Sequence, residues 1–370
     1  MHRILLQSLE KWKDSPARQP LLLRGARQTG KTYLVKQFSD IHFDQLICIN
    51  FEKSPHFQQC FQTIDATKII QQIELNTNQT FVPGKSLLFL DEIQECPNAI
   101  QSMRYFYEQI PDLHVIGAGS LLEFALSAAD FSMPVGRVEF LYLYPMSFSE
   151  MLHAFDQNKL IDYLKHIRPG DQIPVSVHQH LLQQLRLYFI LGGMPRIVSL
   201  YATHQKLLLC RQAQTALLNA YRSDFGKYAS RAQQRYCERV FEKSFDLVAK
   251  HFKYTDIDPD IDARGLKAAI QLLFKANILT PIYCTRATGL PLSATQIDKK
   301  YKLLLLDIGL AQAAGRISPQ LLLNQDLMQM NQGMLTEQYV GQHLLTIQPS
   351  YDQAALFYWQ RDARNSQAEI

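Results

Sequence analysis

The sequence lacks long hydrophobic segments. Its most apolar runs, such as Leu303–Leu306, are far shorter than the roughly 20 apolar residues that a membrane-crossing helix needs. The chain also turns charged soon after Met1, and it has no uninterrupted apolar stretch of signal-peptide length there. We therefore expect a cytoplasmic protein with no membrane partner.

Cysteine is scarce, and neither sign of charge dominates. The 6 cysteines among 370 residues form no C-x-x-C pair and do not cluster with histidine, so neither a structural zinc site nor a disulfide framework is expected. The 38 Lys and Arg residues nearly balance the 34 Asp and Glu residues. The net charge of +4 therefore implies no partner by itself.

The chain does have ample material for folded domains. Hydrophobic residues make up 47% of it and charged residues 19%, which is typical of globular proteins. Its length suits two or three domains. From His204 to Lys253, ten Lys and Arg residues stand against four Asp and Glu residues. This basic segment can follow a nucleic-acid backbone, and a solvated helix face is the alternative interpretation.

A glycine-rich loop matches the phosphate-binding pattern G-x-x-x-x-G-K-[ST], the Walker A motif. Its residues are Gly25, Ala26, Arg27, Gln28, Thr29, Gly30, Lys31 and Thr32. A strand-like run at 20–24 precedes it and a helix-like run at 31–38 follows, so backbone N–H groups can approach phosphates at a helix N-terminus. The motif predicts ATP binding, with Lys31 on the β- and γ-phosphates and the Thr32 hydroxyl on Mg²⁺.

An acidic pair follows a second apolar run, as in a Walker B motif. Residues 86–90 read as a strand buried on both faces, and Asp91 and Glu92 come directly after it. We expect Asp91 to complete the Mg²⁺ shell. Glu92 is expected to orient and polarise the attacking water, which favours hydrolysis over binding alone. A solvated acidic turn is the alternative.

Strand and helix patterns alternate as far as Glu150. Further strands are expected at 45–50 and 113–120, with helical stretches between them. This alternation predicts an α/β fold, a P-loop NTPase parallel sheet flanked by helices. Ligands bind beyond the carboxyl ends of such strands, so the loop, the acidic pair and Ser120 should converge at one edge. Ser120 is a candidate to sense the γ-phosphate or the water, and it also suits a helix N-cap.

These motifs resemble a known group, the prokaryotic AAA-type ATPases whose C-terminal half is an uncharacterised conserved domain. The resemblance rests on residues 24–32, 91–94, 117–120, 136–137 and 144–150, in that order. It implies that Arg137, before the fifth strand, stabilises charge on the transferred phosphate, within the chain or across the interface of a homo-oligomer. A guanidinium suits this role because it is permanently charged. A surface ion pair near Glu139 is the alternative.

After Glu150 the alternation stops and a mainly helical region begins, which predicts a domain boundary near residue 160. The element Gly192–Arg196 reads as a tight turn before a new helix. Helices at 240–251 and 264–274 and a strand-like tail at 276–283 resemble a winged helix. Arg264 and Lys267 lie on the early turns of the second helix, where a recognition helix meets DNA. Docking of a protein partner is the alternative.

The last segment reads as a buried strand at 300–310, a helix around Glu337 and a strand-like run at 356–361. In the resembled family this tail is similar to a restriction-endonuclease-like fold, whose metal site uses a helix glutamate, a strand acid and a later Glu-x-Lys. Glu337 and Glu369 are the candidates here, but the other acid and the lysine would follow Ile370. We therefore do not expect a working metal-dependent nuclease.

Together these features predict three domains. They are a P-loop ATPase domain over 1–160, a helical region with a winged helix over 161–290, and a truncated, restriction-endonuclease-like α+β domain over 291–370. The leading hypothesis is an Mg²⁺-dependent ATPase that couples its nucleotide cycle to a C-terminal nucleic-acid- or protein-binding domain. A slow nucleotide-gated regulatory switch is the alternative, and a nuclease ranks last.

Overall fold

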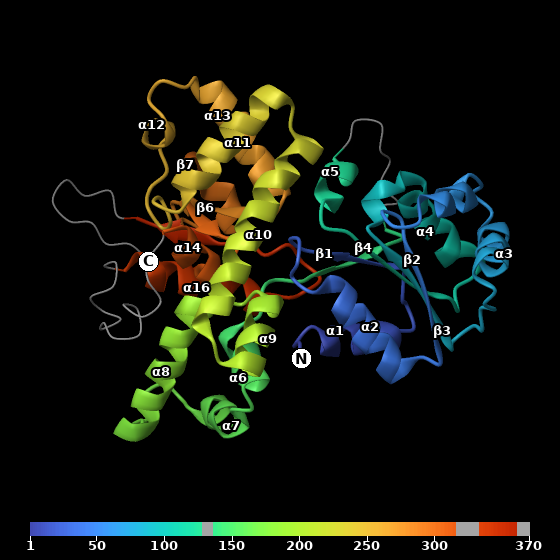
Figure 1. Cartoon of the computed structure of the whole chain (residues 1–370), viewed down its shortest axis with the longest axis horizontal. Coiled ribbons are helices and arrows are strands. Elements are labelled where there is room, and N and C mark those ends of the chain that lie inside the picture. The colour runs from blue at the N-terminus through green and yellow to red at the C-terminus, as the bar shows by residue number, and fades with distance from the viewer. Residues whose placement is uncertain (128–135, 316–332, 361–370) are drawn as a thin grey trace. The chain divides into compact units, whose positions relative to one another are not determined.

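The structure is a computed structural model that describes residues 1–127, 136–315 and 333–360. The chain divides into two compact units (Figure 1). The N-terminal unit comprises Arg3–Tyr144 and the short segment Pro349–Gln353. The C-terminal unit comprises Met1–His2, Pro145–Gln348 and the residues from Ala354 onward. The chain therefore passes from one unit to the other several times.

A five-stranded parallel sheet forms the N-terminal unit, in the order β2-β3-β4-β1-β5. Its strands are β1 (Leu21–Arg24), β2 (Gln45–Asn50), β3 (Ser86–Asp91), β4 (His114–Ala118) and β5 (Glu139–Tyr142). All neighbouring strands pair in parallel, which confirms the expected P-loop sheet. Leu23 on β1 and Asp91 on β3 are both in register with Ala118 on β4. The carboxyl ends of these three strands therefore lie at one edge.

Helices cover both faces of this sheet (Figure 1). They are α1 (Leu6–Lys13), α2 (Lys31–His42), α3 (Ala66–Thr77), α4 (Pro97–Gln109) and α5 (Leu122–Leu126), with 3₁₀ turns at Pro55–Phe61 and Ile93–Glu95. Alternate side chains of one strand enter opposite cores. Leu21 and Leu23 pack with α1 and α2, whereas Leu22 packs with α3 and α4. Burial on both faces thus explains why these strands are continuous apolar runs.

The C-terminal unit is mainly helical and carries a small mixed sheet, as expected. Its helices are α6 (Phe148–Ala154), α7 (Asn158–His166), α8 (Val175–Leu191), α9 (Pro195–His204), α10 (Leu207–Tyr228), α11 (Arg231–Ser244), α12 (Tyr254–Ile257), α13 (Ala263–Lys275), α14 (Ile308–Ala314) and α16 (Met334–Ile347). The strands β6 (Leu279–Thr285), β7 (Gln296–Leu305) and β8 (Phe357–Trp359) take the order β7-β6-β8. β6 is antiparallel to β7 and parallel to β8. In the described ranges, no helix is long and apolar enough to span a bilayer.

The prediction of a helix at 240–251 is wrong for the second half of that range, because α11 ends before this half begins. The following residues instead run along β7. Val248 forms a bridge with Leu303, and the Phe252 N–H donates to the Tyr301 carbonyl at 2.9 Å. Val248 and Phe252 are both buried. Their apolar character therefore reflects pairing with a distant strand rather than a helix face.

The first helix after the parallel sheet belongs to the C-terminal unit. Met151 and Leu152 on α6 pack with Tyr188 on α8 in one core. The chain therefore changes unit between Tyr144 and Pro145, ahead of the boundary expected near residue 160.

A buried carboxylate ties parts of the C-terminal unit together. Asp307 follows β7, is fully buried, and accepts hydrogen bonds from the Gly193 N–H at 2.6 Å and the Leu310 N–H at 3.0 Å. It thus caps α14 and holds the turn after α8. Gly192 has φ 72°, and a side chain there would meet the Asp307 carboxylate. The turn at Gly192–Arg196 therefore needs glycine, and it joins segments that the sequence assigned to separate domains.

Candidate functional site

The glycine-rich loop connects β1 to α2 at the carboxyl edge of the sheet. Gly25 has φ 143° and lies so close to the Leu143 carbonyl that no side chain fits there. Gly30, with φ 94°, is the N-cap of α2. Glycine adopts such backbone conformations without strain. The loop thus leads directly into the N-terminus of α2, where the helix dipole and free N–H groups favour an anion.

Lys31 is the first residue of α2, and its ammonium lies within the loop. Its Nζ donates to the carbonyl oxygens of Gly25 and Ala26, both at 2.8 Å. Burial lowers the pKa of Lys31 to about 8, although the nearby carboxylates of Glu92 and Asp91 act in the opposite direction. Phosphate oxygens are stronger partners for an ammonium than neutral carbonyls are. The position of Lys31 therefore suits an anion held by the loop.

Asp91 connects the end of β3 to two neighbouring elements. Its carboxylate accepts hydrogen bonds from the Thr32 hydroxyl at 3.1 Å and from the Asn50 amide at 3.0 Å. Burial raises the pKa of Asp91, and the Asn50 hydrogen bond partly offsets that rise. Thr32 and Asp91 thus bring together hydroxyl and carboxylate oxygens, which are ligands that Mg²⁺ prefers in proteins. These two residues fit a magnesium ion at this edge.

Asn50 belongs to this site although no motif contains it. It is the last residue of β2 and lies in register with Asp91. A signal was present in the sequence, because a polar residue that ends a strand of a parallel sheet falls at the ligand-binding edge.

Glu92 lies among polar neighbours directly after Asp91. Its carboxylate accepts hydrogen bonds from the Gln94 amide at 2.8 Å and, at the longer distance of 3.4 Å, from the Ser120 hydroxyl. Gly119 leaves room for this arrangement, because a side chain there would meet the Gln94 amide. The structure thus brings Glu92 and Ser120 together and adds Gln94 as a neighbour.

Arg137 lies apart from the loop. It precedes β5, whose first residue, Glu139, is in register with Leu21 at the amino end of β1. The loop follows the other end of β1, about 13 Å away along the strand at roughly 3.3 Å per residue. The Arg137 guanidinium donates to Glu108 at 3.2 Å and lies over the Tyr107 ring. Within its own chain, Arg137 is therefore not placed to contact a phosphate at the loop.

Glu337, the candidate metal ligand on a helix, is paired with a lysine. Its carboxylate accepts a hydrogen bond from the buried Lys302 at 2.8 Å. Glu369 lies outside the described residues. Within the part of the chain that the structure describes, no group of three or more His, Cys, Asp and Glu side chains could hold a metal ion. The nuclease hypothesis gains no support from these residues.

The basic segment His204–Lys253 is partly neutralised. Arg239 pairs with Asp258 at 3.1 Å. Lys227 and Lys243 each have an acidic partner within one helical turn, both at 3.8 Å. Such surface pairs contribute little stability, but they lower the local excess of positive charge. The segment is therefore a weaker candidate for following a phosphate backbone than its composition suggests.

Helix α13 presents an exposed polar face. Arg264, Lys267 and Gln271 are exposed, and their spacing of three and four residues places them on one side of the helix. Leu266, on another side, is buried. The segment before the helix, residues 256–262, contains four aspartates. The basic face of α13 is thus bounded by acidic residues near its N-terminus.

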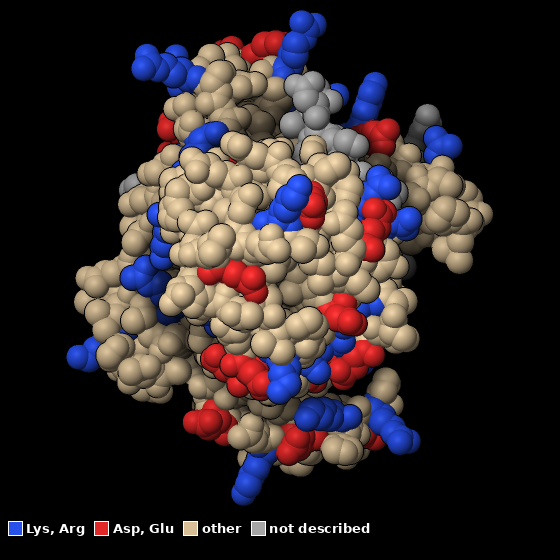
Figure 2. Space-filling view, turned by 90° about the vertical axis from the view of Figure 1, so that its right-hand side faces the viewer, with Lys and Arg blue, Asp and Glu red and all other residues tan. Residues whose placement is uncertain are grey.

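One face of the molecule shows no field of a single charge sign. In Figure 2, Lys and Arg side chains are interspersed with Asp and Glu side chains on a surface that is otherwise uncharged. A mixed surface of this kind does not steer a polyanion over long distances. This face therefore shows no extended basic patch that could follow a phosphate backbone.

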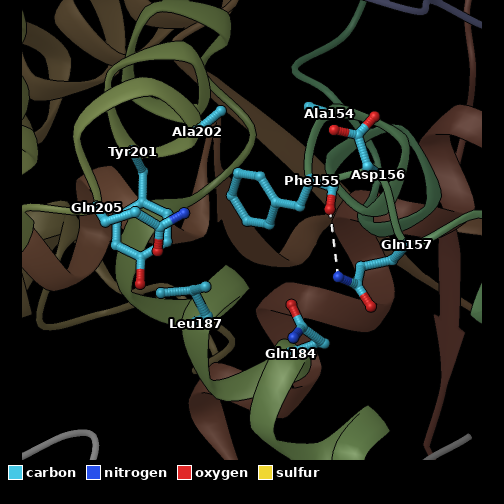
Figure 3. A pocket seen from close by; sticks show the side chains of 9 residues that line it. All are labelled: Ala154, Phe155, Asp156, Gln157, Gln184, Leu187, Tyr201, Ala202 and Gln205. Carbon is cyan, nitrogen blue, oxygen red and sulfur yellow. Dashed lines mark hydrogen bonds between the residues drawn. The ribbon is translucent and has the colours of Figure 1, made fainter.

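A cavity of about 280 Å³ lies in the C-terminal unit, among residues of α6, α8, α9 and the turn after α6 (Figure 3). Phe155 and Tyr201 line it, with ring centres 5.5 Å apart. The Gln157 amide donates to the Phe155 carbonyl at 3.2 Å. The lining combines aromatic rings with amide side chains and contains none of the motif residues.

Family models match both parts of the chain. Residues 17–152 match a family described as an AAA domain, and residues 182–321 match a domain of unknown function, DUF8612. Together with the loop, the acidic strand end and the sheet order, the first match identifies an AAA-type P-loop domain. A domain of this class implies nucleotide binding. Among curated proteins, no sequence matches the chain.

Solved structures with similar folds include the Walker-type ATPase of Pyrococcus abyssi. It is 15% identical, with a TM-score of 0.53 over 84% of this chain and 94% of that chain, which shows the fold alone. Two proteins of Aeropyrum pernix are each 10% identical: ORC2, solved as ADPNP-ADP complexes, and ORC1, solved in complex with DNA. ORC2 covers 92% of this chain and 95% of its own, with a TM-score of 0.46. ORC1 covers 85% and 93%, with a TM-score of 0.32, and neither score carries an argument about function.

Proposed function

We propose that this chain is an Mg²⁺-dependent ATPase whose nucleotide cycle controls a binding surface on the C-terminal unit. The observation that supports it is the meeting of Lys31, Thr32, Asp91 and Glu92 at one edge of the parallel sheet. A protein that only stores a nucleotide has no need for a second carboxylate at this place. Glu92 therefore favours hydrolysis.

Each side chain has a defined task in this proposal. The N–H groups of residues 25–32 and the Lys31 ammonium bind the β- and γ-phosphates of ATP. Thr32 and Asp91 hold Mg²⁺, which supplies neutralisation of phosphate charge when bound. Glu92 orients and polarises the attacking water. Ser120, beside Glu92, senses the γ-phosphate or that water.

Analogue binding and steady-state ATPase activity test the proposal. Lys31→Ala should abolish binding of a labelled ATP analogue, whereas Lys36→Ala, which changes an exposed lysine on the same helix, should not. Glu92→Gln should keep analogue affinity within about twofold and lower turnover at least about 100-fold. Unchanged affinity in Lys31→Ala would refute the nucleotide site. Full turnover in Glu92→Gln would refute this mechanism of hydrolysis.

A slow nucleotide-gated switch is the second candidate, and the surroundings of Glu92 favour it. Hydrogen bonds from Gln94 and Ser120 both end on Oε2 of its carboxylate, where they compete with a water for that oxygen. This arrangement predicts basal turnover below about 1 s⁻¹, the lower end of common enzymes, and acceleration by a partner. Rates measured with duplex DNA, single-stranded DNA and RNA distinguish the two candidates. Fast turnover without any partner would contradict the switch.

The surface that we propose for nucleic acid is the exposed face of α13. This helix precedes the β6–β7 hairpin, which is the order of elements in a winged helix, and Arg264 and Lys267 lie on its first turns. A recognition helix meets the major groove with its N-terminal residues. Arg264 and Lys267 are therefore the proposed phosphate or base contacts.

Gel shifts with labelled duplex DNA at increasing salt test this surface. Replacing Arg264 and Lys267 by alanine should weaken binding and reduce the salt slope by up to about 2, or about one for each lost phosphate contact. Replacing Lys159 and Lys165, two exposed lysines of α7, removes the same charge elsewhere and should leave binding unchanged. A flat salt response, or equal effects of both double variants, would favour a protein partner instead.

A further inference from the structure

A buried arginine near the start of the chain contacts the phosphate loop, residues 25–32. Arg3 precedes α1, and only 4% of it is exposed. Its guanidinium donates to the Thr29 carbonyl at 2.8 Å through one terminal nitrogen and to the Tyr144 carbonyl at 2.6 Å through the other. All three residues belong to the N-terminal unit. One side chain thus joins three segments that are far apart in the sequence.

The segment Leu143–Tyr144 also contacts the phosphate loop directly. The Leu143 N–H donates to the Arg24 carbonyl at 2.8 Å. The Leu143 carbonyl lies against Gly25 so closely that a side chain at position 25 would collide with it. Leu143 is therefore held at the beginning of the loop, and Tyr144 is tied through Arg3 to Thr29 near its end.

The residues at which the chain leaves the N-terminal unit gather in the same place. Arg3 follows His2 and Tyr144 precedes Pro145, and both of these neighbours in sequence belong to the C-terminal unit. The segment Pro349–Gln353 also reaches this edge, because the Ser350 carbonyl accepts a hydrogen bond from the Tyr142 N–H at 2.9 Å. Hydrogen bonds inside the N-terminal unit thus connect the phosphate loop to the residues at which the chain continues into the C-terminal unit.

We propose that Arg3 is a positioning residue that fixes the phosphate loop to Leu143–Tyr144, so that nucleotide bound at the loop orders the segment leading into the C-terminal unit. A guanidinium suits this task because its planar fork holds two acceptors in a fixed geometry and stays charged when buried. Its positive charge beside Thr29 also favours phosphates at the loop. The inference rests on the proposed nucleotide site.

Hydrogen–deuterium exchange on the full chain tests this role. In the wild type, a non-hydrolysable ATP analogue should slow exchange both in the loop and in residues 142–147. In Arg3→Gln we expect about tenfold weaker analogue binding, because a charged hydrogen-bond donor is lost. At saturating analogue, the loop of this variant should still be protected, whereas residues 142–147 should exchange as without nucleotide. Arg3→Lys keeps the charge but not the fork, so it should recover affinity without recovering protection at 142–147.

Arg18→Gln is the matched control. Arg18 also donates to two backbone carbonyls, those of Lys13 and Pro111, but neither belongs to the phosphate loop. This variant should bind the analogue and protect residues 142–147 as the wild type does. Wild-type affinity and protection in Arg3→Gln would overturn the proposal, and so would the same losses in Arg18→Gln. If the wild type itself fails to bind the analogue, the nucleotide site is refuted as well. Measuring the wild type first distinguishes this outcome from an effect of Arg3.

Discussion

At the scale of single residues, Lys31 combines a charge with burial. Burial lowers its pKa to about 8, so a growing fraction of Lys31 is neutral in the free protein as the pH rises above that value. Bound phosphates favour the ammonium form, because an opposite charge stabilises it. Nucleotide binding above this pH is therefore coupled to uptake of a proton, whereas binding below it is not.

This coupling predicts a pH-dependent affinity. The affinity for a labelled ATP analogue, measured at a series of pH values, should be constant below the Lys31 pKa. Above that pKa the affinity should fall, approaching about tenfold per pH unit. Lys31→Arg keeps its charge throughout, so its profile should stay flat on both sides. Equal slopes in the two proteins would show that another group titrates.

At the scale of elements, the end of α8 and the start of α14 depend on one carboxylate. Asp307→Ala leaves the Gly193 and Leu310 N–H groups buried without their acceptor. We expect a loss of about 2 to 4 kcal/mol in the free energy of unfolding, since each buried unpaired group costs about 1 to 3 kcal/mol. Urea unfolding followed by circular dichroism measures it.

The control for this change is Asp246→Ala. Asp246 is exposed and pairs with Lys243 at 3.8 Å, so its removal should alter the unfolding free energy by less than about 0.5 kcal/mol. Similar losses in the two variants would mean that Asp307 contributes no more than a surface acid does.

At the scale of the whole molecule, the position of Arg137 has a consequence for assembly. It lies at the amino end of β5, whereas the phosphate loop lies at the carboxyl end of β1. A role of Arg137 in phosphate transfer therefore concerns the nucleotide of a second copy of the chain. Turnover per chain should then rise with protein concentration, because the complete site forms only between copies.

Mixing of variants tests this arrangement. Arg137→Ala should bind the ATP analogue within about twofold of the wild type but lose the concentration-dependent rise in turnover. A mixture of Arg137→Ala and Glu92→Gln should regain activity, since one copy supplies the arginine and the other the glutamate. If turnover does not depend on protein concentration and Arg137→Ala leaves it unchanged, the role of Arg137 is limited to its surface pair with Glu108.

The sequence alone determined the class of the N-terminal unit and the position of its site. Residues 25–32 form one contiguous motif, and the alternation of strands and helices predicts a parallel sheet. In such a sheet the ends of strands that are far apart in sequence meet at one edge. For this reason the sequence predicts Asp91, Glu92 and Ser120 as neighbours of the loop.

Only the tertiary structure decided the contacts that no local pattern encodes. Arg3 contacts Thr29 and Tyr144, which lie far from it in the sequence. The turn after α8 requires glycine because the carboxylate of the distant Asp307 lies against it. The residues after α11 follow a distant strand instead of continuing a helix, because burial against that strand overrides local propensity. Spacing along the chain predicts neighbours within an element or at a sheet edge, whereas partners brought together by packing depend on the whole fold.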